Sequence, residues 1–340
     1  MRLVHTPEPQ PRPELEAERR EPGRGRDART PSEIPRAGWR DILLRVLHKL
    51  GEDNVSLVAS GVALNTLLAV FPAMALLASV YGMFASPAQV AKEISPFYGL
   101  LPHDAASIIQ TQLQALARPH DRMLGIGAIV SFVVSIYYSS QGVSALMSAT
   151  NIAYTERERR GFLELVMVAA GFAVGAVVGF VLMLLLTLAV PLALQHVPLP
   201  GFVSMAVLVL RWVLLWLFAV VGIAIVYRYA PSRQNAQWRW VSWGSVIAAT
   251  LWLGASFLFS LYVRDFGSYG KTYGALGGVI VLIMWFYLQG FAIVLGAEFN
   301  AETEHQTAVD TTRGPPAPMG ERGAYVADTL GPSQPSKGRT

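Results

Sequence analysis

The sequence contains no cysteine and unusually little charge. Charged residues make up 15% of its 340 residues, whereas hydrophobic residues make up 53%. The absence of cysteine excludes disulfides, thiol catalysis and thiolate metal sites. Roughly 25% of the residues of an average soluble domain are charged. A soluble protein of this length could not cover its surface with so little charge, and the composition therefore favours a membrane protein.

Long apolar stretches account for this composition. An α-helix needs about 20 apolar residues to cross a hydrocarbon core of roughly 30 Å. Six stretches of this kind lie at about 57–84, 123–149, 163–194, 202–227, 241–263 and 274–297. The sequence therefore predicts an all-α polytopic membrane protein with six transmembrane helices.

The two ends of the chain differ from this central region. Residues 1–38 are rich in Pro, Arg and Glu and contain no apolar segment of the kind that a cleavable signal peptide requires. Residues 304–340 have a similar polar composition. Such segments bury too little apolar surface to fold. We expect a disordered cytoplasmic tail at 1–38, a six-helix membrane domain at 39–303 and a second disordered cytoplasmic tail at 304–340.

Two elements outside the spans are also expected to be helical. Trp39, Ile42, Leu43, Val46, Leu47 and Leu50 recur at helical spacing, and Arg40, Arg45, His48 and Lys49 fall on the other side. This segment is too short to span a bilayer, and its amphipathic pattern predicts a helix at the cytoplasmic interface. A partner-binding helix is the alternative. The loop at 86–122 is expected to form a helical extracytoplasmic cap.

Lysine and arginine predict the orientation, because they are enriched in cytoplasmic loops. Nine lie near one set of helix ends: Arg40, Arg45, Lys49, Arg157, Arg159, Arg160, Arg228, Arg233 and Arg239. Five lie near the other set: Lys92, Arg118, Arg122, Arg264 and Lys271. This asymmetry predicts a multi-pass inner-membrane protein with both termini in the cytoplasm. The net charge of +4 is then explained by topology and anionic headgroups, and no nucleic-acid partner is expected.

Several polar residues interrupt the apolar stretches. A proline inside a helix leaves one backbone carbonyl without its usual hydrogen-bond donor. Polar side chains within a membrane span are costly, and they are therefore candidates for a functional role. The residues that we expect to line one polar cavity are Asn65, Pro72, Gln141, Arg211, Gln289 and Glu298. The alternatives are a tolerated kink, hydrogen bonds between helices, a snorkelling arginine and, for Glu298, a solvated helix end.

The sequence offers no sign of an enzyme. The six histidines are scattered over tails, loops and helix ends, and no two of them have the spacing of metal ligands. No nucleophile elbow, P-loop or dinucleotide-binding fingerprint occurs in a strand-turn-helix context. We therefore expect no catalytic, cofactor-binding or metal-binding residues.

Four segments in a fixed order resemble one family of proteins. These are Phe71-Pro72, the segment from Ser140 to Tyr154, the segment from Tyr227 to Pro231, and the segment from Tyr273 to Asn300, which contains Gly296-Ala297-Glu298-Phe299-Asn300. Together they are similar to the YihY/virulence factor BrkB family of bacterial inner-membrane proteins, once labelled ribonuclease BN. The resemblance extends over about residues 40–303. It implies six membrane helices with both chain ends in the cytoplasm.

Two functions are compatible with these features. The first is a transport or permease-like role for a lipid or other amphiphile in the cell envelope, because a proline-broken helix and buried polar residues suit a wet cavity. The second is a membrane scaffold, in which the same polar residues only join helices. Membrane lipids are the expected partners, together with a second copy of the chain or another envelope protein. A ribonuclease is not expected, because the sequence shows neither a metal-ligand cluster nor a soluble domain for RNA.

Overall fold

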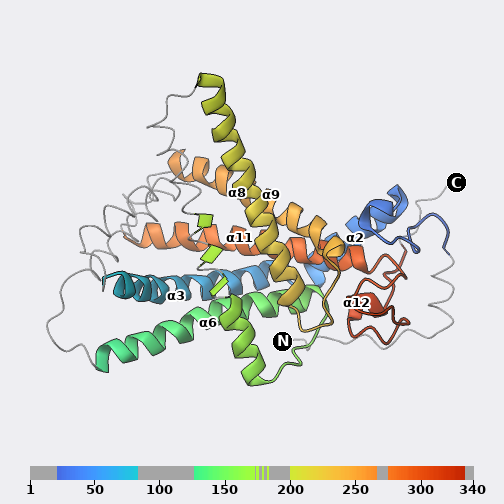
Figure 1. The fold of residues 1–340 in the computed structure, drawn as a ribbon, viewed down its shortest axis with the longest axis horizontal. Helices are drawn as coiled ribbons and strands as arrows, with labels where there is room; N and C mark the ends of the chain where they lie inside the picture. The colour runs from blue at the N-terminus through green and yellow to red at the C-terminus, as the bar shows by residue number, and fades with distance from the viewer. Residues whose placement is uncertain are drawn as a thin grey trace.

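The computed structural model describes residues 21–82, 126–172, 200–265 and 275–333, with the pairs 174–175, 178–179 and 182–183. In chain order its elements are η1 Pro31–Glu33, α2 Arg36–Glu52, α3 Val55–Gly82, α6 Ile126–Ala153, α8 Gly201–Tyr229, α9 Trp238–Asp265, α11 Ala275–Glu304 and α12 Tyr325–Asp328 (Figure 1). A further helix extends over Phe162–Phe172. Apart from one isolated bridge between Ala236 and Thr312, these described ranges contain no strand. The predicted all-α class is therefore confirmed for this part of the chain.

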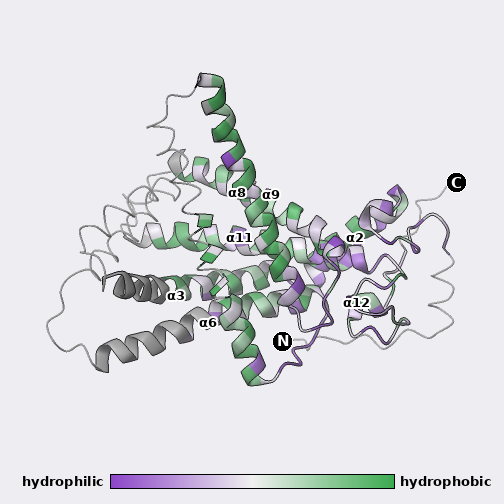
Figure 2. Cartoon of the chain, in the orientation of Figure 1, coloured by the Kyte–Doolittle hydropathy of each residue, from purple (hydrophilic) through white to green (hydrophobic). Residues whose placement is uncertain are grey.

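Within the described residues, three helices are long and apolar enough to cross a membrane by length and composition: Gly201–Tyr229, Trp238–Val263 and Gly277–Glu304. Helix α2 and the first part of α3 pass the same test only as a pair, bent by 63°. Figure 2 shows hydrophobic residues along α8, α9 and α11 and hydrophilic residues near α2 and α12. The molecule is thus built as a helical membrane protein. The number of six spans stays a prediction, and the loop at 86–122 lies outside the described residues.

Helix α11 is the centre of the bundle. It packs against α9 and α3 and also contacts α2 and α6, while α3 packs along α6 and α8 packs against α9 (Figure 1). Glycines allow the closest of these contacts, because a side chain on Gly244 of α9 would collide with the backbone of Gly296 on α11. Small residues let two helix backbones approach in this way.

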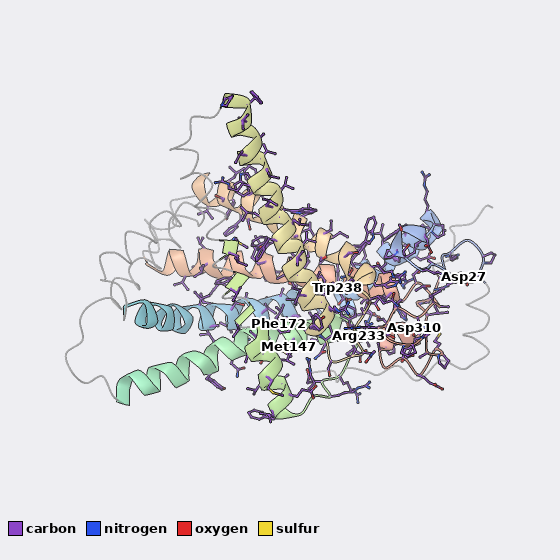
Figure 3. The ribbon with its side chains drawn as sticks, viewed as in Figure 1. Asp27, Met147, Phe172, Arg233, Trp238 and Asp310 are labelled. Carbon is purple, nitrogen blue, oxygen red and sulfur yellow. The ribbon has the colours of Figure 1, made fainter. Side chains whose placement is uncertain are left out.

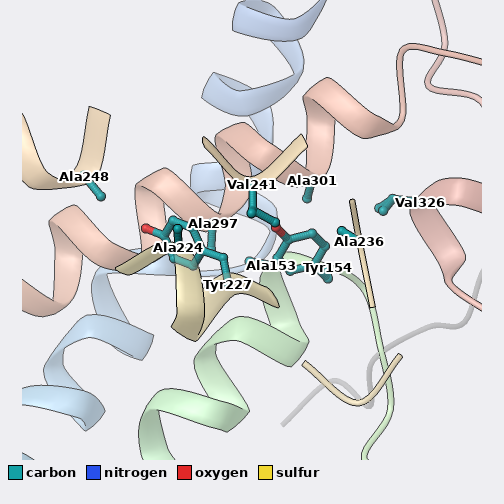
Figure 4. Packing of buried hydrophobic residues seen from close by; sticks show 10 residues of the cluster. All are labelled: Ala153, Tyr154, Ala224, Tyr227, Ala236, Val241, Ala248, Ala297, Ala301 and Val326. Atoms are coloured by element: carbon teal, nitrogen blue, oxygen red, sulfur yellow. The ribbon is translucent and has the colours of Figure 1, made fainter. Parts of the chain in front are cut away.

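Two buried tyrosines join three of the helices at one end of this bundle. Tyr154 follows α6, and Tyr227 lies on α8, and both are almost fully buried. Their rings pack among small residues, including Ala297 of α11 (Figure 4). The Tyr227 hydroxyl donates a hydrogen bond of 2.6 Å to the carbonyl of Ile293 on α11. This contact fixes the end of α8 against the central helix.

The helix ends near α12 gather on one side of the molecule, which we call the α12 side. The beginnings of α3 and α9 and the ends of α6, α8 and α11 all lie there (Figure 1). The segments that follow α6 and α8 are joined, because Ser232 donates its backbone N–H to Asn151 Oδ1 at 2.7 Å. The backbone N–H of Gln234 donates to the carbonyl of Gly323 at 3.0 Å. Polar loops and the C-terminal segment therefore meet on this side.

The described parts of both chain ends are packed on the α12 side. Arg26 is 2% exposed and donates hydrogen bonds to the carbonyls of Gln306 and Gly331. Thr307 Oγ1 donates to the carbonyls of Arg26 and Ala28. These segments contain few apolar residues, and this composition indicates disorder. Composition does not reveal hydrogen bonds between segments that are far apart in the sequence. The division into a membrane domain and two disordered tails stays a prediction.

Helix α2 differs from its predicted amphipathic pattern at Arg45. Ile42 and Val46 face the protein as core residues, and Arg45 is buried beside them with 5% exposure. Leu43 and Leu47 are exposed instead, at 51% and 65%. Arg45, which the sequence places on the polar side of this helix, is therefore a buried residue of the protein. The reason is a partner on α11, the carboxylate of Glu302, which lies 2.5 Å from Arg45 Nε.

Candidate functional site

The residues predicted to line one cavity lie on four helices. Asn65 of α3 donates from Nδ2 to the carbonyl of Gly61 in its own helix at 2.8 Å. Gln141 is half-buried on α6, directly before Gly142. A Cβ atom added to Gly142 would lie 3.3 Å from the Cβ atom of Ala69 on α3. Asn65 and Gln141 thus lie on helices in close contact.

The other predicted residues lie farther along the chain. Pro72 falls within α3, which runs from Val55 to Gly82, and its side chain lies outside the described residues. Arg211 is half-buried on α8, with Cζ 5.5 Å from the centroid of the Trp212 ring. Gln289 of α11 is 7% exposed and donates from Nε2 to Ser256 Oγ of α9 at 3.2 Å. The hydrogen bonds of Asn65 and Gln289 go to residues outside the set of six cavity candidates. That the six residues line one shared cavity stays a prediction.

Glu298 is the predicted residue with the most unusual surroundings. It is 0% exposed, and α11 continues for six residues beyond it to Glu304. A solvated helix end, the alternative that the sequence left open, is therefore wrong. Among the described residues, no N–H or hydroxyl donor is paired with either carboxylate oxygen of Glu298, and the group within hydrogen-bonding reach is the Asp53 carboxyl. A buried ionised carboxylate without donors is strongly disfavoured, so this side chain needs a particular explanation.

Charged groups from α2 and from the link between α2 and α3 surround Glu298. Asp53, Lys49 and Glu302 act on it electrostatically. Lys49 Nζ lies 3.4 Å from Asp53 Oδ2, and these two side chains are 24% and 19% exposed. Burial raises the pKa of the Asp53 carboxyl, although the Lys49 ammonium opposes this shift. Asp53 and Lys49 thus connect a fully buried carboxyl group with the solvent.

A second buried ionic group lies nearby and was missed by the sequence analysis. Arg233, in the segment after α8, forms an ion pair with Glu304 of α11 at 2.7 Å. Its Cζ lies 5.0 Å from the centroid of the Tyr154 ring. Burial by itself lowers the pKa of Arg233, and the Glu304 carboxylate outweighs burial and raises it. The sequence counted Arg233 only as a topology signal, because its partner is 71 residues away.

A cavity of about 530 Å³ lies on the α12 side, between the segments that follow α6 and α8. Its lining residues include Arg159, Arg160, Glu164, Tyr229 and Arg233. Figure 3 shows Arg233 on this side of the molecule, near Trp238 at the start of α9. None of the six predicted residues lines this cavity.

The arginines that line the cavity have different partners. Arg160 donates to Glu158 Oε1 at 2.7 Å and to the carbonyl of Ala230 at 2.6 Å, which makes it part of the wall. Arg159 keeps a side-chain exposure of 71%, with Nη2 3.9 Å from Glu156 Oε2. Arg159 is therefore the lining guanidinium best placed to meet a ligand from solution or from a membrane surface.

Exposed apolar side chains begin directly beside this cavity. Phe162, Leu163 and Met167 are 83%, 70% and 60% exposed on the helix Phe162–Phe172. Trp238 at the start of α9 is 50% exposed, and aromatic residues of this kind favour the membrane–water interface. The cavity thus combines polar and cationic groups with an adjoining apolar surface. The described residues contain no group of three or more His, Cys, Asp or Glu side chains suited to a metal ion.

Comparison with known proteins places the sequence among membrane proteins. The family model described as Virulence factor BrkB matches residues 46–320. A ribonuclease-like protein of Bacillus subtilis, YfkH, is 34% identical over 52% of this chain. A UPF0761 membrane protein of Tolumonas auensis is 33% identical over 29% of the chain, and one of Psychromonas ingrahamii is 25% identical over 77%.

The extent of these matches differs between relatives. The aligned part of this chain spans 66% of the Bacillus subtilis protein and 32% of the Tolumonas auensis protein, which is less than two thirds of each. It spans 87% of the Psychromonas ingrahamii protein. No solved structure matches the chain.

Proposed function

The chain belongs to the virulence factor BrkB family, whose relatives include proteins named as membrane proteins, and on this premise we propose that it transports a phospholipid-like amphiphile. The amphiphile carries an anionic headgroup. It enters the cavity on the α12 side with that headgroup, while its acyl chains stay on the neighbouring apolar surface.

One observation carries this proposal, the position of Arg159 between a polar cavity and an apolar helix face. A guanidinium binds phosphate through charge-assisted hydrogen bonds. Arg159 is exposed at the cavity, and Phe162 and Leu163 begin the exposed apolar helix three and four residues later. A ligand that suits both surfaces has a charged head and a hydrocarbon tail. The alternative ligands, a sugar or an ion, would not contact the exposed apolar side chains of Phe162 and Leu163.

The test is a lipid-movement assay in proteoliposomes. Vesicles of phosphatidylcholine contain a trace of headgroup-labelled phosphatidylglycerol, and a membrane-impermeant quencher is added outside. We expect the native protein to expose the inner-leaflet label to the quencher, and Arg159→Gln to slow this exposure by about tenfold, equivalent to about 1.4 kcal/mol. Arg157→Gln is the matched control, because Arg157 lies in the same segment but does not line the cavity.

The outcomes separate transport from the scaffold alternative. Equal rates for protein-containing and empty vesicles would overturn the transport proposal. A stoichiometric protein partner that copurifies with the native protein, without enriched phospholipid, would favour a scaffold. Equal slowing by Arg159→Gln and Arg157→Gln would remove the cavity from the mechanism. That the chain is not an enzyme stays a prediction.

We also propose that the protein spans a bacterial inner membrane six times with both termini in the cytoplasm. The distribution of Lys and Arg supports this orientation, and so does the gathering of alternate helix ends on the α12 side. Because the chain has no cysteine, single cysteines can report sidedness directly. We expect Ser107→Cys, and not Ser32→Cys, to react with an impermeant maleimide in intact cells. The reverse labelling would invert the topology.

Helix α2 is proposed to lie in the membrane interface on the cytoplasmic side. The 63° bend from α3 and the exposed leucines at 43, 44 and 47 support this placement. Arg36 and Arg40 are exposed on the same helix and suit anionic headgroups. Replacing Leu43 and Leu47 with Asn should move α2 off vesicles, which a fluorescent label at Ser32→Cys would detect. An unchanged label environment would contradict the placement.

A further inference from the structure

The buried carboxyl group of Glu298 lacks the partners that an ion needs. The side chain is fully buried, and among the described residues no N–H or hydroxyl donor is paired with either oxygen, whereas the Asp53 carboxyl lies within hydrogen-bonding reach. Nearby Glu302 differs in this respect, because Arg45 Nε lies 2.5 Å and His305 Nδ1 lies 3.7 Å from its Oε2. Over the described ranges, Glu302 therefore forms ion pairs of its own, whereas Glu298 forms none.

The charges around Glu298 leave one negative charge uncompensated. The titratable groups that face it are Lys49 from α2, Asp53 from the link between α2 and α3, Glu302 from α11, and Tyr154 from the end of α6. Arg45 compensates Glu302, which leaves one ammonium, Lys49, for the two carboxyl groups of Asp53 and Glu298. A single bound proton removes the excess charge. Two interacting carboxyl groups that share a proton titrate as a pair.

We propose that Asp53 and Glu298 form a proton-binding site that holds one exchangeable proton between the link of α2 with α3 and helix α11. The proton reaches Glu298 through Asp53, because the Asp53 side chain is 19% exposed and that of Glu298 is buried. Burial raises the pKa of Asp53, which is consistent with a retained proton.

The location of this site gives the proton a mechanical consequence. Asp53 and Asn54 are the only two residues between α2 and α3, and Asn54 has a left-handed φ of 50°. The helices on either side meet at 63°. Loss of the proton places two carboxylates beside one ammonium, and like charges in a partly buried site repel strongly. Deprotonation therefore pushes the bend between α2 and α3 away from α11.

The proton site does not depend on the proposed lipid transport. If lipid transport is established, the proton bound at this site is the ion that couples to it. Only this coupling role rests on the proposed function. The two proposals are tested by different readouts. Proton binding is measured on the purified protein without any lipid gradient.

Infrared difference spectroscopy tests the site directly. The purified full-length protein in detergent is titrated with acid and base, and the C=O band of a protonated carboxyl group is followed in H₂O and D₂O. We expect one carboxyl group to protonate in the native protein above the pH range of ordinary side-chain carboxyls. Glu298→Gln and Asp53→Asn should each abolish this band. Glu321→Gln is the matched control, because Glu321 is exposed, and it should leave the band unchanged.

A second measurement guards against variants that do not fold. Glu298→Asp keeps the carboxyl group, so it should keep the band at a shifted frequency. The proposal is overturned if the native protein shows no such band, or if the band persists in both Glu298→Gln and Asp53→Asn. It is also overturned if the Glu321→Gln control loses the band.

Discussion

Gly244 of α9 and Gly296 of α11 meet with no room for a side chain on either. A Cβ atom on Gly296 would lie 2.6 Å from the carbonyl oxygen of Gly244 and 2.5 Å from the Tyr227 hydroxyl. The two helices are the most extensively packed pair around the central helix. Asn300 reinforces the contact, because its Oδ1 accepts the backbone N–H of Gly244 at 2.7 Å. Two of the residues in Gly296-Ala297-Glu298-Phe299-Asn300 therefore serve this helix crossing.

Gly296→Ala should destabilise the protein by about 1–3 kcal/mol, because the added methyl group must separate two backbones. Thermal unfolding in detergent, followed by size-exclusion chromatography, measures the loss. Gly254→Ala on α9 is the control, because nothing lies within 4 Å of its added Cβ. Alanine favours helices over glycine by up to about 1 kcal/mol, so this control should be neutral or stabilising. Equal effects at the two positions would contradict the close contact.

Arg45→Ala should cost about 3–5 kcal/mol, because it leaves the buried carboxylate of Glu302 without its cation. The two side chains are only 6% and 5% exposed. Arg40→Ala on the same helix is the control, since Arg40 is exposed and should contribute little. Chemical unfolding in mixed micelles gives the comparison. Similar stability of the two variants would show that the pair is not buried in the native protein.

Tyr227→Phe should lower the stability by about 1 kcal/mol, because it deletes the hydroxyl that donates to the Ile293 carbonyl at 2.6 Å. Tyr229→Phe changes an exposed ring two residues later and should have almost no effect. The same unfolding measurement applies to both variants. A loss at position 229 that equals the loss at position 227 would argue against a specific bond between α8 and α11.

Glu158 should make the free energy of unfolding depend on pH in the acidic range. Burial alone raises the pKa of Glu158, but hydrogen bonds from Arg160 and Asn151 outweigh burial and lower the pKa to about 2. Because the folded pKa is depressed, this contribution is complete above the ordinary value of 4.5 and is lost as the pH falls towards 2. Glu158→Gln should therefore flatten the acid dependence of stability in that interval.

Tryptophan fluorescence at fixed denaturant follows this loss. The control is Glu321→Gln, which removes an exposed carboxyl group and should retain the slope of the native protein. An unchanged slope in Glu158→Gln would mean that Arg160 does not hold the carboxylate in solution.

The sequence identified much of the architecture, and its errors have a common cause. The apolar stretches predicted α8, α9 and α11, because long hydrophobic helices are signalled by local composition. Arg45 was placed on the polar side of its helix, and its burial was missed, because helical periodicity does not reveal a carboxylate 257 residues away. Composition also does not reveal the hydrogen bonds between the two chain ends that bury Arg26 and Thr307.

The candidate site was only partly predictable for the same reason. Glu298 stood out in the sequence as a carboxyl group near the end of an apolar helix, but not Asp53, which lies beside a polar turn. The cavity around Arg159 could have been suspected from the basic segment after α6 and its apolar continuation. Its second wall comes from residues 229–235 and Gly323, which no local pattern connects to Arg159.

The sequence by itself determined that this is a membrane protein, that it is helical and to which family it belongs. Each of these conclusions depends on local composition or on the order of motifs along the chain. The tertiary structure alone decided which polar groups are partnered. It pairs Arg45 with Glu302 and Arg233 with Glu304. Within the part of the chain that the structure describes, it leaves Glu298 buried with no paired N–H or hydroxyl donor. Partnership depends on distances between segments far apart in the chain. Those distances are set by how the helices pack around α11.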